Sequence, residues 1–366
     1  MKLFSRKKDV VIGVDVSATA IKLVELSKKK KGYALTAFAN VPLPRDAIVE
    51  NTVIDSIAVS QALLDAIEQS GTKVRNAAIS VSGNALIVKV IQVPIVTEFE
   101  LESQIQFEAD QHVPFDIEDV YSDFQILGEN EDDPENMDVV LVACKREIID
   151  DYQLVLSEAG LNTSCVDCAV FAIENAAEEL GLLDLSSTEL EAAEALDDDM
   201  DVSEGAVALI NIGANIININ ILREGQMAFV RDQFYGGQNL TEMVQKAHAV
   251  SFNAAEEMKK LNFSEIDPNA MEEFYSGLSS EIGRSLDFYG ANNAEYPVQS
   301  ILLSGGCALI PNIEVEMYQR LGIETRVFNP FDYIDVSESE FDVQAVKHAG
   351  PMMAVSVGLA MRSFDQ

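Results

Sequence analysis

The chain of 366 residues contains no tryptophan, three histidines and only four cysteines. So few thiols and imidazoles offer little material for a disulfide framework or for a zinc centre, which needs four ligands. Basic residues are also scarce, since 25 lysines and arginines face 61 acidic residues and leave a net charge of −36. Such a charge repels phosphate backbones, so we expect no general nucleic-acid binding. We also find no apolar run of about 18 residues and expect no membrane-spanning helix.

Apolar residues make up 48% of the chain, which is ample for a hydrophobic core. The length is about two and a half times that of a typical domain of roughly 150 residues, so we expect two domains or several subdomains. The opening residues, MKLFSRKKDVVIG, lack the apolar core of a signal peptide. Few thiols without a secretion signal are typical of the reducing cytoplasm, where we expect this protein.

The charge is unevenly distributed. Residues 1–31 carry nine basic and three acidic side chains, a local charge of +6. Such a segment suits either an anionic membrane surface or a solvated tail followed by a lysine-rich turn. Acidic residues gather in 129–138 and 184–204, for which we predict a solvated loop and a flexible linker.

Cysteine and histidine give no clear metal motif. Cys165 and Cys168 have CxxC spacing, but no second pair and no histidine cluster accompanies them. We therefore favour a buried or incidental role for both thiols.

An internal repeat relates residues 10–26 to residues 206–222. Each segment reads as an apolar strand, a tight turn of small and polar residues and a second apolar strand, with Asp15 matching Asn211. Each is followed by a further strand and then by helical periodicity, over 56–70 and 239–252. Duplicated α/β halves of this kind predict two lobes with a cleft between them. Because small residues let backbone N–H groups surround an anion, the two turns predict a nucleotide held between the lobes.

A third element follows in the second half. Residues 301–309 read as a buried strand that ends in Ser304, Gly305 and Gly306. A glycine pair leaves room for a base or ribose against the backbone. Taken alone, this segment is better explained as an ordinary strand-to-helix turn, and only its order behind the two turns favours a nucleotide.

In this order the motifs resemble the actin, Hsp70 and FtsA superfamily, and most closely the PilM family of type IV pilus assembly. The residues similar to the two phosphate motifs are Asp15, Ser17, Ala18, Thr19 and Lys22, then Asn211, Gly213, Ala214 and Asn215, followed by Gly236 and Gly237. Glu256 and Lys259 resemble a ribose contact, and Arg284 with Ser285 precedes the adenosine motif Ser304, Gly305 and Gly306. Residues 108–115 and 357–364 are also typical of the family.

The resemblance implies an α/β fold of the two-lobed, actin-like ATPase type, with duplicated ribonuclease-H-like halves and an inserted FtsA/PilM-type subdomain. The implied boundaries are a first-lobe core over 1–80 with 166–182 and 346–366, an insert over 81–165, an acidic linker over 183–204, and a second lobe over 205–345 with a helical cap near 245–285. The insert's own pattern agrees, with strands within 76–94 and 138–145 and helices over 100–113 and 146–160.

The resemblance also implies ATP with Mg²⁺ in the cleft between the lobes. Asp15 would hold Mg²⁺ through water and Lys22 would contact phosphate. The family usually has aspartate where this chain has Asn211. A neutral amide weakens both a hard-cation site and the electrostatic support for water attack. We therefore expect slow or absent hydrolysis and assign no catalytic residue, the alternative being a tolerated change with full activity.

By resemblance, the chain is a cytoplasmic adaptor that binds the N-terminal peptide of the membrane protein PilN. It would thereby couple the cytoplasm to the PilN/PilO inner-membrane complex and the assembly motor, at the inner face of the inner membrane. Phe107, Pro114 and Phe115, on or beside the predicted helix over 98–112, are candidates for the wall of a peptide groove. Core packing of the two aromatic side chains is the alternative.

Two other functions belong to the same superfamily. An FtsA-like polymerising protein would carry an amphipathic anchor after the last helix, and we expect none beyond residues 362–366. A small-molecule kinase would need a carboxylate base beside a substrate hydroxyl, and no segment clearly supplies one.

Overall fold

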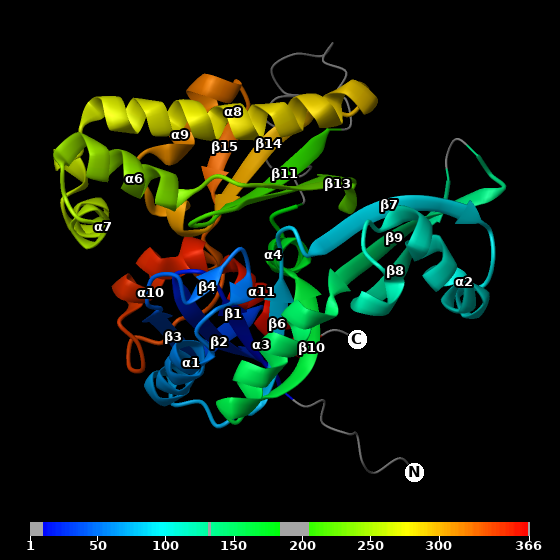
Figure 1. Cartoon of the computed structure of the whole chain (residues 1–366), viewed down its shortest axis with the longest axis horizontal. Coiled ribbons are helices and arrows are strands. Elements are labelled where there is room, and N and C mark those ends of the chain that lie inside the picture. Colours follow the sequence, from blue (N-terminus) through cyan, green and yellow to red (C-terminus); the bar gives the residue numbers. More distant parts are fainter. Residues whose placement is uncertain (1–9, 131–132, 184–204, 365–366) are drawn as a thin grey trace. The chain divides into compact units, whose positions relative to one another are not determined.

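The computed structural model describes residues 10–130, 133–183 and 205–364 (Figure 1). The basic residues 1–9 and most of the predicted acidic linker, residues 184–204, lie outside the described residues. The chain forms two compact units. The first consists of Met1–Leu23, Ala37–Ala169 and Arg362–Gln366, and the second of Val24–Thr36 and Val170–Met361. The finer boundaries at 80, 165 and 345 remain predictions.

The sheet that opens the chain has the strand order β10-β6-β1-β2-β3. Its strands are β1 (Ile12–Val16), β2 (Ala20–Lys28), β3 (Tyr33–Pro42), β6 (Asn76–Val81) and β10 (Asn162–Cys168). β6 runs parallel to both β1 and β10. Every residue of β1 is buried, as expected of a strand covered on both faces. Helices α1 (Ser56–Ser70) and α3 (Arg146–Glu158) and the short pair β4 (Ile48–Val49) and β5 (Thr52–Val53) complete this part.

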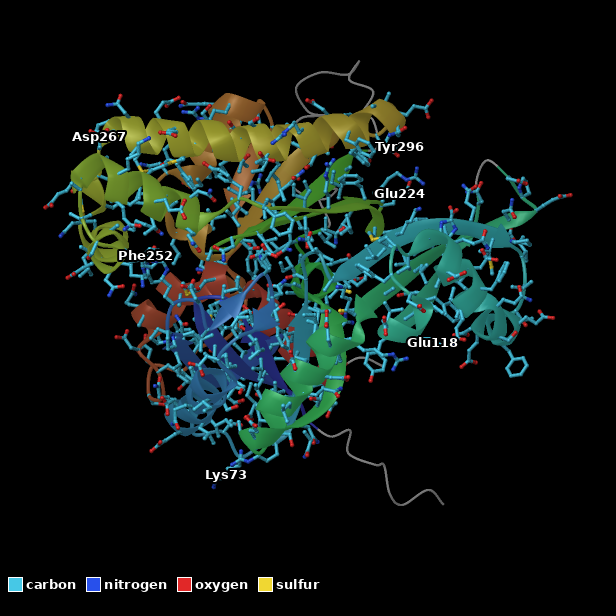
Figure 2. The ribbon with its side chains drawn as sticks, in the orientation of Figure 1. Lys73, Glu118, Glu224, Phe252, Asp267 and Tyr296 are labelled. Atoms are coloured by element: carbon cyan, nitrogen blue, oxygen red, sulfur yellow. The ribbon has the colours of Figure 1, made fainter. Side chains whose placement is uncertain are left out.

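A second, antiparallel sheet has the order β7-β9-β8. It consists of β7 (Leu86–Pro94), β8 (Val120–Glu129) and β9 (Asn136–Lys145), with helix α2 (Glu98–His112) between β7 and β8. The turn η1 (Ile117–Asp119), with Glu118 labelled in Figure 2, leads into β8. The predicted solvated loop over 129–138 is shorter than expected, because β9 already begins at Asn136. β8 also escaped prediction, since its partly exposed, acid-containing sequence lacks a continuous apolar run.

The sheet of the second unit has the order β13-β12-β11-β14-β15. Its strands are β11 (Ala206–Ile212), β12 (Ile217–Arg223), β13 (Gln226–Gln233), β14 (Val298–Ser304) and β15 (Glu324–Val327). β12 is antiparallel to β11 and β13, whereas β11, β14 and β15 run parallel. When the five strands of each sheet are numbered in chain order, both sheets have the same spatial order, which is third, second, first, fourth, fifth. The duplication predicted from the sequence is confirmed in this topology.

The helices of the second unit are α4 (Ala169–Glu179), α6 (Gly237–His248), α7 (Phe252–Leu261), α8 (Pro268–Asn292), α9 (Ile313–Leu321), α10 (Val343–Ala349) and α11 (Ala354–Met361), with short 3₁₀ turns η2 (Phe263–Glu265), η3 (Gly306–Leu309), η4 (Pro330–Asp332) and η5 (Gly350–Met353). The last turn, η6 (Arg362–Phe364), belongs to the first unit. α11 is buried along its whole length. The periodicity over 239–252 belongs to two helices, because Ala249 adopts a left-handed φ of 52° and Ser251 caps α7. Asp267 caps α8 by accepting from the N–H of Asn269 (Figure 2).

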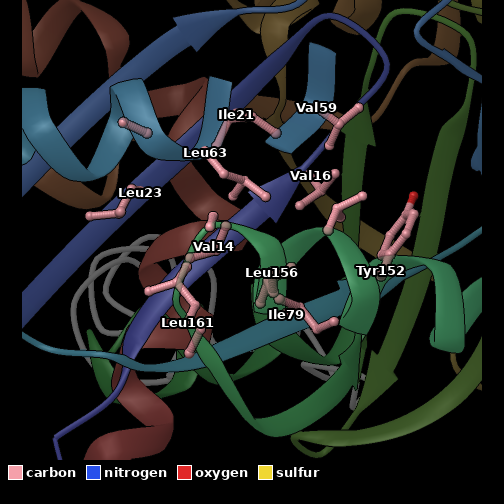
Figure 3. Packing of buried hydrophobic residues seen from close by; sticks show 14 of the residues in the cluster. Val14, Val16, Ile21, Leu23, Val59, Leu63, Ile79, Tyr152, Leu156 and Leu161 are labelled. Atoms are coloured by element: carbon pink, nitrogen blue, oxygen red, sulfur yellow. The ribbon is translucent and has the colours of Figure 1, made fainter. Parts of the chain in front are cut away.

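Separate hydrophobic cores support these parts. Figure 3 shows the core of the first unit, where Val14 and Leu23 of the five-stranded sheet pack with Leu63 of α1 and Leu156 of α3. The small sheet has its own core, in which Leu101 and Ile105 of α2 pack against the strands. In the second unit, one side of α8 faces the sheet with residues such as Phe274, Leu278 and Ile282.

Candidate functional site

The first predicted phosphate turn joins β1 to β2. The backbone N–H and the hydroxyl of Ser17 both donate to the carbonyl of Ala20, at 3.1 and 2.8 Å. This closes the turn around Ala18 and Thr19. Their own N–H groups donate to no other residue in the part of the chain that the structure describes. The turn thus presents two adjacent donors suited to an anion.

Asp15 and Lys22 flank this turn and contact each other. The Lys22 ammonium lies 2.6 Å from the Asp15 carboxylate and 3.2 Å from the Ser17 hydroxyl. Both charged side chains are only 12% exposed. Asp15, the predicted carboxylate for Mg²⁺, and Lys22, the predicted phosphate contact, therefore neutralise each other's charge.

Tyr152 of α3 is buried near Asp15. Burial, together with the negative charge of Asp15, raises the pKa of its hydroxyl.

The second predicted turn joins β11 to β12 in the same way. Gly213 N–H donates to the carbonyl of Ile216 at 2.9 Å. As in the first turn, the N–H groups of the next two residues, Ala214 and Asn215, donate to no other described residue. Both members of the sequence repeat therefore form the same backbone structure.

The start of α6 holds this second turn in place. Gly237 N–H donates to the carbonyl of Gly213 at 3.0 Å, and Gln238 N–H to that of Ala214 at 2.8 Å. A Cβ atom at Gly236 would lie 2.5 Å from the Gly213 oxygen, too close for any other residue. The predicted residues Gly213, Ala214, Gly236 and Gly237 are thus brought together.

Lys259 ties α6 to α7 beside this turn. Its ammonium contacts the carbonyl of Gly237 at 2.8 Å, the hydroxyl of Thr241 at 2.7 Å and the carboxylate of Glu256 at 2.7 Å. Thr241 also bonds to Glu256. Burial raises the pKa of Glu256, but the Lys259 charge and the hydrogen bonds from Lys259 and Thr241 outweigh burial and lower it overall.

Asn211 connects the second turn to the predicted adenosine motif. Its amide nitrogen donates to the Oδ1 of Asn218 at 2.9 Å, and the Ser304 hydroxyl approaches its Oδ1 at 3.5 Å. Gly305 has a φ of +89°, and a Cβ atom there would lie 2.5 Å from the carbonyl oxygen of Ile212 and 2.7 Å from the Oδ1 of Asn211. Glycine is therefore required where the two segments meet. Gly306 follows as the first residue of η3.

Arg284 and Ser285 on α8 lie in different surroundings. The Ser285 side chain is fully buried, and its hydroxyl accepts from Gln233 of β13 at 3.0 Å. The Arg284 side chain is 62% exposed and pairs with Glu281. The contacts of these two residues therefore lie within α8 and toward β13.

Residues that the sequence analysis did not single out complete the second turn. Cys307 donates its thiol to the carbonyl of Gly213 at 3.4 Å, and burial raises its pKa to about 11. Asn218 connects Asn211 to Asp232. Asparagines alternating with isoleucines in β12 were the available signal, since a polar side chain at every second position of an apolar strand marks one face.

The candidate peptide residues lie at α2 and just beyond it. Phe107 is 70% exposed and Pro114 is exposed. Phe115 is half-buried against the core of the small sheet, with the Lys145 ammonium 5.1 Å from its ring centre. Phe99, which is 82% exposed on the same helix, was not predicted. The structure therefore distinguishes two exposed aromatic side chains on α2 from one packed ring beyond it.

Among the described residues, no three or more His, Cys, Asp or Glu side chains, Cys165 and Cys168 included, are grouped so that they could hold a metal ion. Within the same residues, no helix is long and apolar enough to cross a membrane.

The duplicated sheets, each opening with a closed hairpin turn, define an actin-like ATPase fold. Over residues 13–364 the chain matches the sequence model of the type IV pilus assembly protein PilM, and it belongs to that family. It is similar to the solved "PilM-PilN type IV pilus biogenesis complex", with 26% identity and a TM-score of 0.82 over 98% of this chain and 100% of that chain. The ethanolamine utilization protein EutJ from Carboxydothermus hydrogenoformans shares the fold, with 15% identity and a TM-score of 0.51 over 96% of this chain and 89% of EutJ.

Proposed function

We propose that this protein is a nucleotide-binding adaptor of type IV pilus assembly that binds the N-terminal cytoplasmic peptide of PilN. The observation that carries the proposal is the family match over residues 13–364, joined by similarity to a PilM–PilN complex over the full length of that chain. Binding PilN would keep the adaptor at the inner face of the inner membrane, beside the PilN/PilO complex and the assembly motor.

The two hairpin turns support nucleotide binding. Each offers a pair of adjacent N–H groups, at Ala18 and Thr19 and at Ala214 and Asn215, that donate to no described residue. Backbone donors of this kind bind phosphate oxygens without needing positive side chains. Such donors suit ATP in a chain whose net charge is −36.

Further residues of the proposed nucleotide site act by holding these turns. Gly236, Gly237 and Lys259 fix the second turn through backbone and ammonium contacts. Ser304, Gly305 and Gly306 meet Asn211 at the end of β11. Arg284 and Ser285 are proposed with them on the resemblance, Ser285 by holding α8 to β13.

Lys22 and Asp15 would let the first turn hold a magnesium ion as well as a phosphate. A phosphate that binds at the turn draws on the Lys22 ammonium, which otherwise bonds to Asp15. Asp15 would then be the carboxylate that holds Mg²⁺ through water, and the ion would neutralise phosphate charge. The donor chemistry at this turn therefore fits a magnesium-nucleotide complex.

We propose slow or absent hydrolysis. Asn211 stands where the family usually has a carboxylate, and its amide bonds to Asn218 and Ser304. Without a negative charge to support a magnesium ion and the attacking water, this side chain gives the chemical step little support.

Exposed aromatic side chains on α2 support the peptide site. Phe99 and Phe107 are 82% and 70% exposed, and large exposed apolar side chains gathered on one helix mark docking surfaces. Eight positions apart, they lie on one side of the helix, where the exposed Ser103 separates them. We assign Phe107 and Pro114 to the peptide contact and Phe115 to support of their backbone.

Calorimetry of the full chain with Mg²⁺-ATP, repeated with a synthetic PilN N-terminal peptide, tests the function. We expect both ligands to bind, with no phosphate release over hours. Peptide binding without ATP binding would make the turns a structural relic. Rapid ATP turnover without peptide binding would contradict the adaptor and favour an enzyme.

A further inference from the structure

Four polar side chains form one row across the sheet of the second unit. The strand register places Asn211 of β11 opposite both Ser304 of β14 and Asn218 of β12, and Asn218 opposite Asp232 of β13. Side chains directly opposite each other on neighbouring strands point to the same face. Ser304 and Asn218 are 0% and 4% exposed, so water does not replace their partners.

The hydrogen bonds along this row all run in one direction. The Ser304 hydroxyl donates to the Oδ1 of Asn211 at 3.5 Å, and the Nδ2 of Asn211 donates to the Oδ1 of Asn218 at 2.9 Å. The Nδ2 of Asn218 then donates to the Asp232 carboxylate at 2.8 Å. Three donors thus point toward Asp232.

Asp232 sets this direction because an ionised carboxylate only accepts hydrogen bonds. Asn218 must turn its NH₂ group to Asp232, and its oxygen therefore faces residue 211. Residue 211 must donate to that oxygen, which an amide does and a carboxylate does not. The negative charge at β13 thus excludes a second one at the end of β11.

The same direction places the oxygen of Asn211 on the side of the adenosine motif. That atom accepts from Ser304 and lies 2.7 Å from the position that a Cβ atom of Gly305 would take. The amide of Asn211 therefore connects the segment at 211–215 with the segment at 304–306.

We propose that Asp232 is a positioning residue: it fixes the direction of this hydrogen-bond chain, requires an amide at position 211, and so holds the two segments together. The effect on ligands rests on the proposed nucleotide function, whereas the chain of hydrogen bonds exists without a ligand.

Three variants test the coupling. Asn211→Asp places a carboxylate beside the Oδ1 of Asn218, so that two acceptors face each other. If the Asn218 amide turns over, its Oδ1 faces the Asp232 carboxylate instead, and the same repulsion arises there. Adding Asp232→Asn lets the whole row reverse, because the new amide at position 232 donates to Asn218 and the NH₂ group of Asn218 donates to the new carboxylate at position 211. The matched control adds Asp287→Asn, on α8, to the same Asn211→Asp change. Both double variants carry the same net charge.

Urea unfolding without nucleotide is the first measurement. We expect Asn211→Asp to lower the unfolding midpoint, Asp232→Asn to restore most of that loss, and Asp287→Asn to restore none. If the Asn211→Asp protein does not fold, the proposal is supported when the double variant with Asp232→Asn folds and the double variant with Asp287→Asn does not. Equal midpoints for the two double variants would overturn the proposal.

ATP affinity of the same proteins is the second measurement. We expect about a tenfold weaker affinity in Asn211→Asp and recovery in the double variant with Asp232→Asn. If the unfolding midpoints change as expected but ATP affinity is the same in all variants, the claim that Asp232 positions the two segments for the nucleotide is wrong. If the parent protein binds no ATP, the proposed function fails, while the unfolding series still decides whether Asp232 sets the direction.

Discussion

Lys259 and Glu256 bond to each other and to the first turn of α6. The ammonium bonds to the Gly237 carbonyl, the Thr241 hydroxyl and the Glu256 carboxylate, and its side chain is 16% exposed. A partly buried ammonium with three partners is held in place by all of them. Neutralising Glu256 therefore weakens the support of the second turn as well as one ion pair.

The lowered pKa of Glu256 gives this contact a pH dependence. A carboxyl whose pKa is lower in the folded state stabilises the fold above its unfolded pKa and loses that effect as the pH falls through the folded value. We expect Glu256→Gln to reduce the free energy of unfolding by about 1 kcal/mol at neutral pH, with the difference from the parent shrinking in acid. Urea unfolding between about pH 7 and about pH 3 measures it.

Glu257→Gln is the matched control, because Glu257 is the exposed neighbour on α7. A difference that grows in acid, or an equal effect of the two substitutions, would contradict the assigned role of Glu256.

At the scale of elements, the aromatic side chains of α2 and of the segment after it differ in function: one is exposed for a partner, and the other packs in the core. Phe107 is exposed, whereas Phe115 packs against the core of the small sheet and under the Lys145 ammonium. We expect Phe107→Ala to change the free energy of unfolding by less than about 0.5 kcal/mol and to weaken PilN peptide binding about tenfold. We expect Phe115→Ala to cost about 2 kcal/mol of stability.

Calorimetry with the peptide and urea unfolding of both variants distinguish these outcomes. Because the chain has no tryptophan, Phe107→Trp also introduces a single tryptophan, which can be excited apart from the tyrosines and whose emission should shift to shorter wavelength when the peptide covers it. Phe288→Trp, at an exposed position of α8, is the control. Loss of fold in Phe107→Ala, or an unchanged emission, would assign Phe107 to packing instead.

The elements show which parts of the fold a sequence can predict. The repeated hairpin turns were predictable because each forms from contiguous residues with small side chains at fixed positions. β8 was not, since a strand with one exposed face tolerates acidic residues that read as a loop. The row from Ser304 to Asp232 escaped too, because its contacts depend on the register of four strands.

At the scale of the molecule, charge opposes one proposed ligand. The chain carries −36, and a field of that sign slows the approach of an anion and speeds that of a cation. The turns supply backbone donors, and Lys22 is paired with Asp15. Binding of ATP therefore depends on short-range hydrogen bonds after an unfavourable approach.

We accordingly expect salt to change the two association rates in opposite directions. The Debye length falls from roughly 30 Å at 0.01 M to about 8 Å at 0.15 M ionic strength, so added NaCl screens the repulsion of ATP and raises its association rate constant. A lysine-tagged PilN peptide should associate more slowly over the same range, and an uncharged peptide tag serves as the control. Stopped-flow fluorescence with a labelled ATP analogue and the Phe107→Trp protein measures both. An ATP rate that falls with salt would show instead that a local positive field, centred on a Lys22 freed from Asp15, governs the approach of the nucleotide.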